Sequence, residues 1–328
     1  MSRAGFGASL TELEQLHDRE YEDIVEDLIN PERFPNIDED ILRRYNDGES
    51  IDIWAGRWIY RMLNSQKPLQ EKVALFWHQV FATGWFKGEH HKGMFQQIDM
   101  FRTVGMSSIQ TILSQLARNP AMLFWLDNNE NHKDEPNENF GRELLELFSM
   151  GVGNYTEEDI KNAARAFTGW TFEQPIPLYP NGHYTPSFAY IEKDHDDSEK
   201  VFLGEKGRFN GDDIIEIITR QPATANFIAR HIYNFFVADE PQVPAWNTVP
   251  PQDPEAINTL VTAYFESAGE MRTMLKTLFN SDFFKESRQR RVKSPVELIT
   301  STIKLAGTHK FPDPSLKSLA ESSAVMGQ

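Results

Sequence analysis

The segment 136–170 constrains the fold more than any other part of the chain, because it carries the start and stop signals of two consecutive helices. Asn137 can cap the first helix, Glu138 lies favourably in its first turn, and Gly151 can end it. Thr156 with Asp159 three residues later is typical of a capping box that opens a second helix. The pattern therefore predicts a helical hairpin.

Helical spacing of apolar residues also dominates the rest of the chain, and it predicts a mainly α fold. We expect one multi-helical domain over residues 1–328, with a possible sub-boundary in the Pro-rich stretch 241–254. The exception is 171–211, which is rich in Pro, Gly, Tyr and Asp and has short alternating pieces at Ser187–Ile191 and Lys200–Leu203. There we expect a long irregular excursion with a small β-hairpin.

The opening of the chain contains a second helix signal. Thr11 followed by Glu14 is typical of a capping box, and the helix it opens should end before Pro31.

Within the hairpin, the first helix has two adjoining faces. Its core stripe is Phe140, Leu144, Leu147 and Phe148, and its polar strip is Asn139, Glu143, Glu146 and Met150. Two carboxylates one turn apart, next to apolar surface, could share a proton or a cation. We therefore take Glu143, Glu146 and Arg142 as candidate catalytic residues. The alternative is a solvated acidic face with an ion pair from Glu138 to Arg142.

Two further histidines are candidates for polar chemistry. His78 lies in an apolar helix, two turns from Glu71 on the same face, where it could be an oriented base or simply a packed core residue. The segment Asp194–Asp197 combines three carboxylates with an imidazole, and oxygen-rich clusters suit Ca²⁺ or Mg²⁺. His195 and Asp196 are therefore candidate metal ligands; a solvated turn is the alternative.

Composition excludes several classes of function. The net charge of −16, without a long basic run, disfavours nucleic-acid partners and anionic lipid surfaces. The absence of Cys excludes disulfides, thiolate nucleophiles and zinc–thiolate sites. We expect no transmembrane segment, since the longest apolar stretch, 73–86, is interrupted and short. No phosphate loop, dinucleotide fingerprint, zinc-protease motif or nucleophile elbow is present.

The hairpin sequence resembles the signature of a bacterial family known as Domain of Unknown Function 1800 (DUF1800). Six other stretches are also similar to that family, in order along the chain: 3–7, 76–83, 119–128, 195–204, 222–224 and 293–297. Val80 stands where the family usually has a second histidine. The resemblance further implies that the chain is clipped at both ends, and that an export signal could be missing, so the compartment is left open.

Two hypotheses follow. The first is an enzyme with acid–base or divalent-metal-assisted chemistry at Glu143, Glu146, His78 and the His195–Asp196 loop. The second is a non-catalytic accessory or envelope module that binds a protein partner. In that module, charges including Arg142 and Arg165 would form a buried structural network. The substrate and any cofactor beyond a divalent cation are not indicated.

Overall fold

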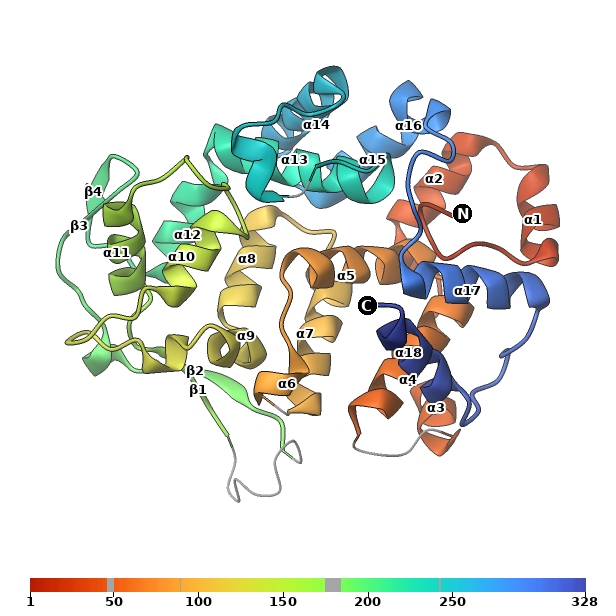
Figure 1. Ribbon diagram of the computed structural model, residues 1–328, viewed down its shortest axis with the longest axis horizontal. Helices are drawn as coiled ribbons and strands as arrows, with labels where there is room; N and C mark the ends of the chain where they lie inside the picture. Colours follow the sequence, from red (N-terminus) through yellow and green to blue (C-terminus); the bar gives the residue numbers. More distant parts are fainter. Residues whose placement is uncertain (46–49, 89, 175–183, 242) are drawn as a thin grey trace. The chain divides into compact units, whose positions relative to one another are not determined.

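Helices form most of the chain, which confirms the mainly α prediction (Figure 1). The computed structural model describes residues 1–45, 50–88, 90–174, 184–241 and 243–328. Within these ranges the helices α1 to α18 are accompanied by short 3-10 turns and by two antiparallel pairs of strands.

The chain divides into two compact units. Unit 1 contains Met1–Phe76, Phe235–Asp239 and Leu275–Gln328, and unit 2 contains Trp77–Asn234 and Glu240–Met274. The expectation of one domain with a sub-boundary at 241–254 stays a prediction.

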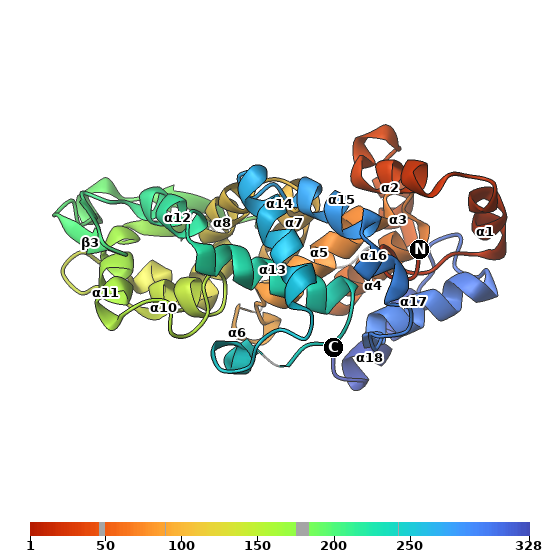
Figure 2. The ribbon, with the colours of Figure 1, turned by 90° about the horizontal axis from the view of Figure 1, so that it is seen from above.

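Unit 1 is built from both ends of the sequence, and α4 packs against α17 and α18 (Figure 2). Its own elements are α1 (Leu10–His17), α2 (Tyr21–Ile29), η1 (Pro31–Arg33), α3 (Glu39–Tyr45), α4 (Ile51–Asn64), α16 (Asp282–Glu286), α17 (Pro295–Ala306) and α18 (Leu316–Val325). Three helices contribute residues to both units: α5 (Pro68–Val80), α13 (Pro222–Phe236) and α15 (Met271–Asn280).

The first capping box lies two residues before the predicted one. Ser9 caps α1, its hydroxyl accepting from the Glu12 amide at 3.3 Å while Glu12 accepts from the Ser9 amide at 2.6 Å. Helix α1 ends at His17 and α2 begins at Tyr21, so two helices occupy the stretch before Pro31 for which a single helix was predicted. The S/T-x-x-E pattern occurs twice here at an offset of two, and the pattern alone does not choose between the two.

A buried ionic cluster lies in the core of unit 1. Lys72 and Arg291 both contact the carboxylate of Glu297, and Arg291 does so with two nitrogens, each at 2.9 Å. Burial lowers the pKa of Lys72, and the positive charges of Arg291 and Lys293 lower it further. One carboxylate therefore serves two cations.

Unit 2 contains the predicted hairpin. Its own elements are α6 (Trp85–Gly88), α7 (His91–Val104), α8 (Ile109–Ala117), α9 (Pro120–Trp125), η2 (Asn128–Glu130), α10 (Asn139–Glu146), α11 (Glu157–Ala166), β1 (Trp170–Glu173), β2 (Ser187–Tyr190), η3 (Glu192–Asp194), β3 (Lys200–Phe202), β4 (Glu205–Gly207), α12 (Gly211–Thr219), η4 (Val243–Asn247) and α14 (Pro254–Glu266).

The excursion after the hairpin contains two small sheets rather than one hairpin. Strand β1 pairs with β2 in antiparallel register, Trp170 opposite Tyr190, and β3 pairs with β4, Lys200 opposite Gly207. The two alternating pieces predicted from sequence form β2 and β3. They do not pair with each other, because β2 pairs with β1 and β3 pairs with β4. Part of the predicted excursion, 175–183, lies outside the described residues.

Candidate functional site

Two buried asparagines hold the start of α10 against the end of α11. The side-chain amide of Asn131 donates to the carbonyl of Ala164 at 2.8 Å, and its oxygen accepts from the backbone N–H of Asn137 at 2.9 Å. Asn128 donates to the carbonyl of Trp170 at 2.9 Å. The last carbonyls of a helix lack the usual partner four residues on; the carbonyl of Ala164 accepts from the Phe167 amide at 3.1 Å and from Asn131. Neither asparagine was predicted from the sequence to have a functional role.

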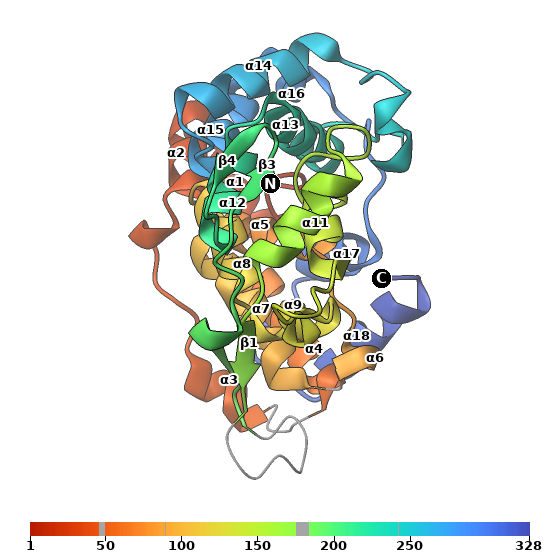
Figure 3. The ribbon, with the colours of Figure 1, turned by 90° about the vertical axis from the view of Figure 1, so that its left-hand side faces the viewer.

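The contact between α10 and α11 depends on small side chains; Figure 2 labels the two helices next to each other, and Figure 3 shows α11 from the side. A Cβ on Gly141 would lie 3.1 Å from the amide nitrogen of Ala164 and 3.2 Å from the carbonyl oxygen of Ile160. Phe140, Leu144 and Phe148 are buried, as the core stripe predicts. Leu147 is 41% exposed, which corrects that prediction, and Leu145 is buried instead.

Glu143 lies half-buried on the predicted polar strip. Its Oε2 atom is buried and accepts no hydrogen bond from the described residues. Burial raises the pKa of Glu143, the neighbouring charge of Glu146 raises it further, and Arg142 acts in the opposite direction. A carboxyl group in this position holds its proton more tightly than an exposed glutamic acid.

Glu146 lies one turn further along the same strip. Its Oε2 accepts a hydrogen bond from the phenol of Tyr155, which lies in the turn before α11, at 2.9 Å. Burial is the main cause that raises the pKa of Tyr155, followed by this hydrogen bond and the charge of Glu146. The phenol is therefore a donor throughout the physiological pH range, and it fixes one oxygen of Glu146.

Arg142 pairs with carboxylates other than those of the polar strip. It contacts Glu138 at 3.2 Å, as the sequence predicts, and donates to both oxygens of Glu157 at 3.0 and 2.8 Å. Glu157 belongs to α11, so Arg142 joins the two helices of the hairpin. Its catalytic role stays a prediction.

His78 occupies the last turn of α5 and is only slightly exposed. Burial lowers the pKa of His78 to about 4, so its imidazole is neutral at physiological pH. A neutral imidazole can accept a proton or bind a metal. Its role as an oriented base stays a prediction.

The loop at His195 and Asp196 is held by hydrogen bonds to the end of α11. His195 donates from Nδ1 to the carbonyl of Thr168 at 3.0 Å. One oxygen of Asp196 accepts from Arg165 Nε at 2.7 Å and the other from the Ser198 amide at 2.8 Å. The hydrogen bonds from Ser198 and Arg165 lower the pKa of Asp196 to about 2, although its burial acts in the opposite direction.

These contacts occupy the oxygens that a cation would need. No group of three or more His, Asp or Glu side chains that could hold a metal ion occurs among the described residues. The metal-ligand role of His195 and Asp196 stays a prediction, and it requires Arg165 to leave Asp196.

The predicted residues thus form two local groups. Glu143, Glu146 and Arg142 interact on α10, and His195 with Asp196 is bound to Thr168 and Arg165. The convergence of both groups with His78 in one site stays a prediction.

Sequence reasoning missed a cluster of cations in unit 1. Arg3, Arg288, Arg291 and Lys293 line one cavity, together with Lys285. The sequence feature that could have indicated this cluster is the short basic run 288–293. It contains too few cations to predict a binding site by itself, and Arg3 comes close to it only in the folded chain.

No helix in the described ranges is both long and apolar enough to cross a membrane.

A family model described as "Protein of unknown function (DUF1800)" matches residues 1–328. No curated protein and no solved structure matches the chain. The resemblance inferred from the hairpin and the six other stretches is confirmed over the whole sequence.

Proposed function

The chain belongs to the DUF1800 family, and from that premise we propose that it is an enzyme whose acid–base step is carried out by Glu143 and Glu146 of α10. The observation that carries the proposal is the unequal environment of two carboxyl groups one turn apart. Oε2 of Glu143 is buried without a hydrogen-bond donor among the described residues, while Oε2 of Glu146 accepts from Tyr155.

This inequality assigns the two roles. A carboxylate oxygen that is buried without a donor is costly, so burial favours the protonated form of Glu143. Glu146 receives a hydrogen bond that suits a carboxylate. Glu143 is therefore the proton donor and Glu146 the proton acceptor, which is the usual division of labour between two carboxyl groups in different surroundings. Both side chains are only partly buried and can be reached from solvent.

A titration followed by carbon-13 NMR of the glutamate carboxyl groups tests the pair directly. We expect the pKa of Glu143 to lie above the ordinary glutamate range, and to fall when Glu146→Gln removes the neighbouring charge. The exposed Glu135→Gln is the control and leaves Glu143 unchanged. The proposal is contradicted if the pKa of Glu143 lies in the ordinary glutamate range, or if it does not change in Glu146→Gln.

Activity is sought in a panel of ester, amide and glycoside substrates. Loss of a general acid or base lowers the rate by roughly 10²–10⁴-fold. We expect Glu143→Gln and Glu146→Gln each to cause a loss in that range, whereas Glu135→Gln retains the rate. Equal rates in all variants would remove Glu143 and Glu146 from the reaction.

A divalent cation is the second form of the same proposal, since two carboxylates one turn apart can share one. Titration of the metal-free protein with Mn²⁺ alone separates the two forms. Binding that Glu143→Gln abolishes supports metal-assisted chemistry at α10. If Asp196→Asn abolishes Mn²⁺ binding instead, the metal site is the loop at His195.

The alternative is a non-catalytic module that docks on a protein partner, with Arg142 in a structural role. The bridge from Arg142 to Glu157 of α11 favours that role for Arg142. On this alternative, Arg142→Met lowers the free energy of unfolding, and Glu143→Gln changes neither stability nor any rate.

A further inference from the structure

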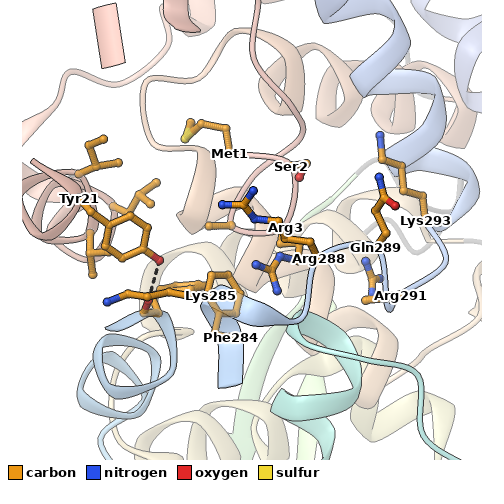
Figure 4. Close-up of a pocket in the computed structure, with 15 residues that line it drawn as sticks. Met1, Ser2, Arg3, Tyr21, Phe284, Lys285, Arg288, Gln289, Arg291 and Lys293 are labelled. Atoms are coloured by element: carbon orange, nitrogen blue, oxygen red, sulfur yellow. Dashed lines mark hydrogen bonds between the residues drawn. The ribbon is translucent and has the colours of Figure 1, made fainter. Parts of the chain in front are cut away.

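A cavity of ≈ 870 Å³ in unit 1 has one apolar wall and one cationic wall (Figure 4). The apolar wall is the face of α2 that carries Tyr21, Ile24, Val25 and Leu28. The opposite wall comes from Arg3, from α16 and from the segment that follows α16. A cavity of this size can hold a small organic molecule.

The cationic wall has no counter-charge on the cavity surface. Its five cations are Arg3, Lys285, Arg288, Arg291 and Lys293, and no carboxylate is among the residues described as lining the cavity. This arrangement occurs in a chain whose net charge is −16. Behind the wall, Glu297 is shared between Lys72 and Arg291, and Asp239 accepts from the backbone of Val292 at 3.2 Å. Glu297 is therefore a counter-charge of Arg291, and the charge of Asp239 also acts on Arg291, whereas no ion pair of Arg3, Lys285, Arg288 or Lys293 is recorded in the described ranges.

Arg3 is held in place before any ligand binds. Its guanidinium lies 3.7 Å from the centre of the Phe284 ring, and it donates to the hydroxyl of Ser287 at 2.6 Å. Burial lowers the pKa of Arg3; Tyr21 acts in the opposite direction, and the charge of Arg288 lowers it further. An arginine fixed by stacking and one hydrogen bond keeps its remaining donors oriented at low entropic cost.

Arg288 has its hydrogen-bonding capacity free. In the described part of the chain its side chain makes no recorded ion pair or hydrogen bond, and Figure 4 shows it close to Arg3. Two neighbouring guanidinium groups form a geometry that suits the oxygens of a dianion. Gln289, the next residue, has a φ of 62°, so the chain turns sharply directly after Arg288.

We propose that this cavity binds an organic phosphate, with the phosphate between Arg3 and Arg288 and the apolar body of the ligand against α2. A dianion relieves the mutual repulsion of the cations better than a monoanion. The apolar wall distinguishes an organic phosphate from a free phosphate ion, because only the organic molecule fills it. The proposal is independent of the acid–base pair on α10.

Isothermal titration calorimetry of the whole chain tests the site with three probes: phenyl phosphate, inorganic phosphate and phenol. We expect phenyl phosphate to bind more tightly than either half-probe. Its affinity should fall about tenfold or more when Arg288→Glu reverses one charge, and should also weaken with added salt. Octyl phosphate in place of phenyl phosphate distinguishes a lipid-like body from an aromatic one.

Arg290→Glu is the matched control. Arg290 is equally exposed and lies two residues away, but it does not line the cavity. We expect the affinity of the Arg290→Glu variant for phenyl phosphate to fall far less than that of Arg288→Glu, because Arg290 does not line the cavity and cannot donate to the bound phosphate. An equal loss of affinity in Arg288→Glu and Arg290→Glu would show that phenyl phosphate responds only to the general positive charge of this region, and would contradict a specific site. Inorganic phosphate binding as tightly as phenyl phosphate would overturn the role of α2, and no binding at millimolar concentration would overturn the proposal. Arg288→Gln, checked for folding by circular dichroism, replaces Arg288→Glu if the charge reversal unfolds the chain.

Discussion

Tyr155 donates its phenolic proton to Oε2 of Glu146 across 2.9 Å, from the turn between α10 and α11 to the last residue of α10. The bond joins the connection of the hairpin to its polar strip. It also makes Glu146 different from Glu143, whose Oε2 has no such donor among the described residues.

Removal of this phenol should weaken the hairpin. We expect Tyr155→Phe to lower the free energy of unfolding by about 1 kcal/mol, because a hydrogen bond to a carboxylate is lost at a partly buried site. Urea denaturation followed by circular dichroism measures the change. Tyr190→Phe is the control, since the Tyr190 ring is half-exposed and no hydrogen bond of its hydroxyl is recorded in the described ranges. Equal effects of the two substitutions would contradict the role of the hydroxyl.

The buried cluster in unit 1 predicts an asymmetry between its members. Lys72→Met leaves Glu297 with its two contacts from Arg291, so we expect a loss of less than about 1 kcal/mol. Glu297→Gln leaves two buried cations without a counter-charge and should cost about 3–5 kcal/mol. Chemical denaturation of both variants measures the difference. A larger loss for Lys72→Met than for Glu297→Gln would overturn this description of the cluster.

Stability should depend on pH through His231. This residue is buried against the rings of Phe227 and Trp246, and burial lowers the pKa of its imidazole to about 3. Between pH 3 and the ordinary histidine value of about 6.5, the unfolded chain binds the proton and the folded chain does not. The stabilisation is therefore complete above pH 6.5 and is lost as the pH falls towards 3.

Substitution of His231 should remove this dependence. We expect the slope of unfolding free energy against pH, between pH 4 and 6, to fall by up to about 1.4 kcal/mol per pH unit in His231→Phe. His17→Phe, at an exposed position of α1, should retain the slope of the unmodified chain. An unchanged slope in His231→Phe would show that His231 does not titrate in this way.

Gly169 should tolerate alanine far less than Gly153 does. Both have positive φ, 76° and 93°, so both substitutions carry the same backbone strain of about 1 kcal/mol. A Cβ at Gly169 would lie 2.6 Å from the carbonyl oxygen of Ile191, whereas a Cβ at Gly153 meets no atom of the described chain within 4 Å. We expect Gly169→Ala to cost about 2 kcal/mol more than Gly153→Ala, as measured by thermal unfolding. Equal costs would mean that the 191–195 loop shifts freely.

The helical hairpin could be predicted because its signals are local. The capping box at Thr156 and Asp159 forms as the spacing indicates, and Arg142 pairs with Glu138 four residues before it. Local signals did not place Leu147, which is exposed, because α10 ends at Glu146 and Leu147 lies just beyond the regular helical period.

The contacts that define the candidate sites join residues far apart in the sequence. Asp196 accepts from Arg165, 31 positions earlier, and that contact occupies an oxygen assigned from sequence to a metal. Arg3 reaches Ser287 across 284 positions and comes close to Arg288 only in the folded chain (Figure 4). Spacing along the chain carries no information about such pairs, so a basic run of modest length could not be recognised as one wall of a cavity.

The hydrogen bond between Arg3 and Ser287 joins the two ends of the sequence that form unit 1. Residues 1–76 are synthesised before residues 275–328, with which they form unit 1. The apolar faces of residues 1–76 therefore stay exposed to solvent while all of unit 2 is synthesised. Closure over so long a separation is slow, and exposed apolar surface during the delay invites aggregation. We conclude that unit 1 completes its fold only after residues 275–328 have been synthesised, and that residues 1–76 need protection from aggregation until then.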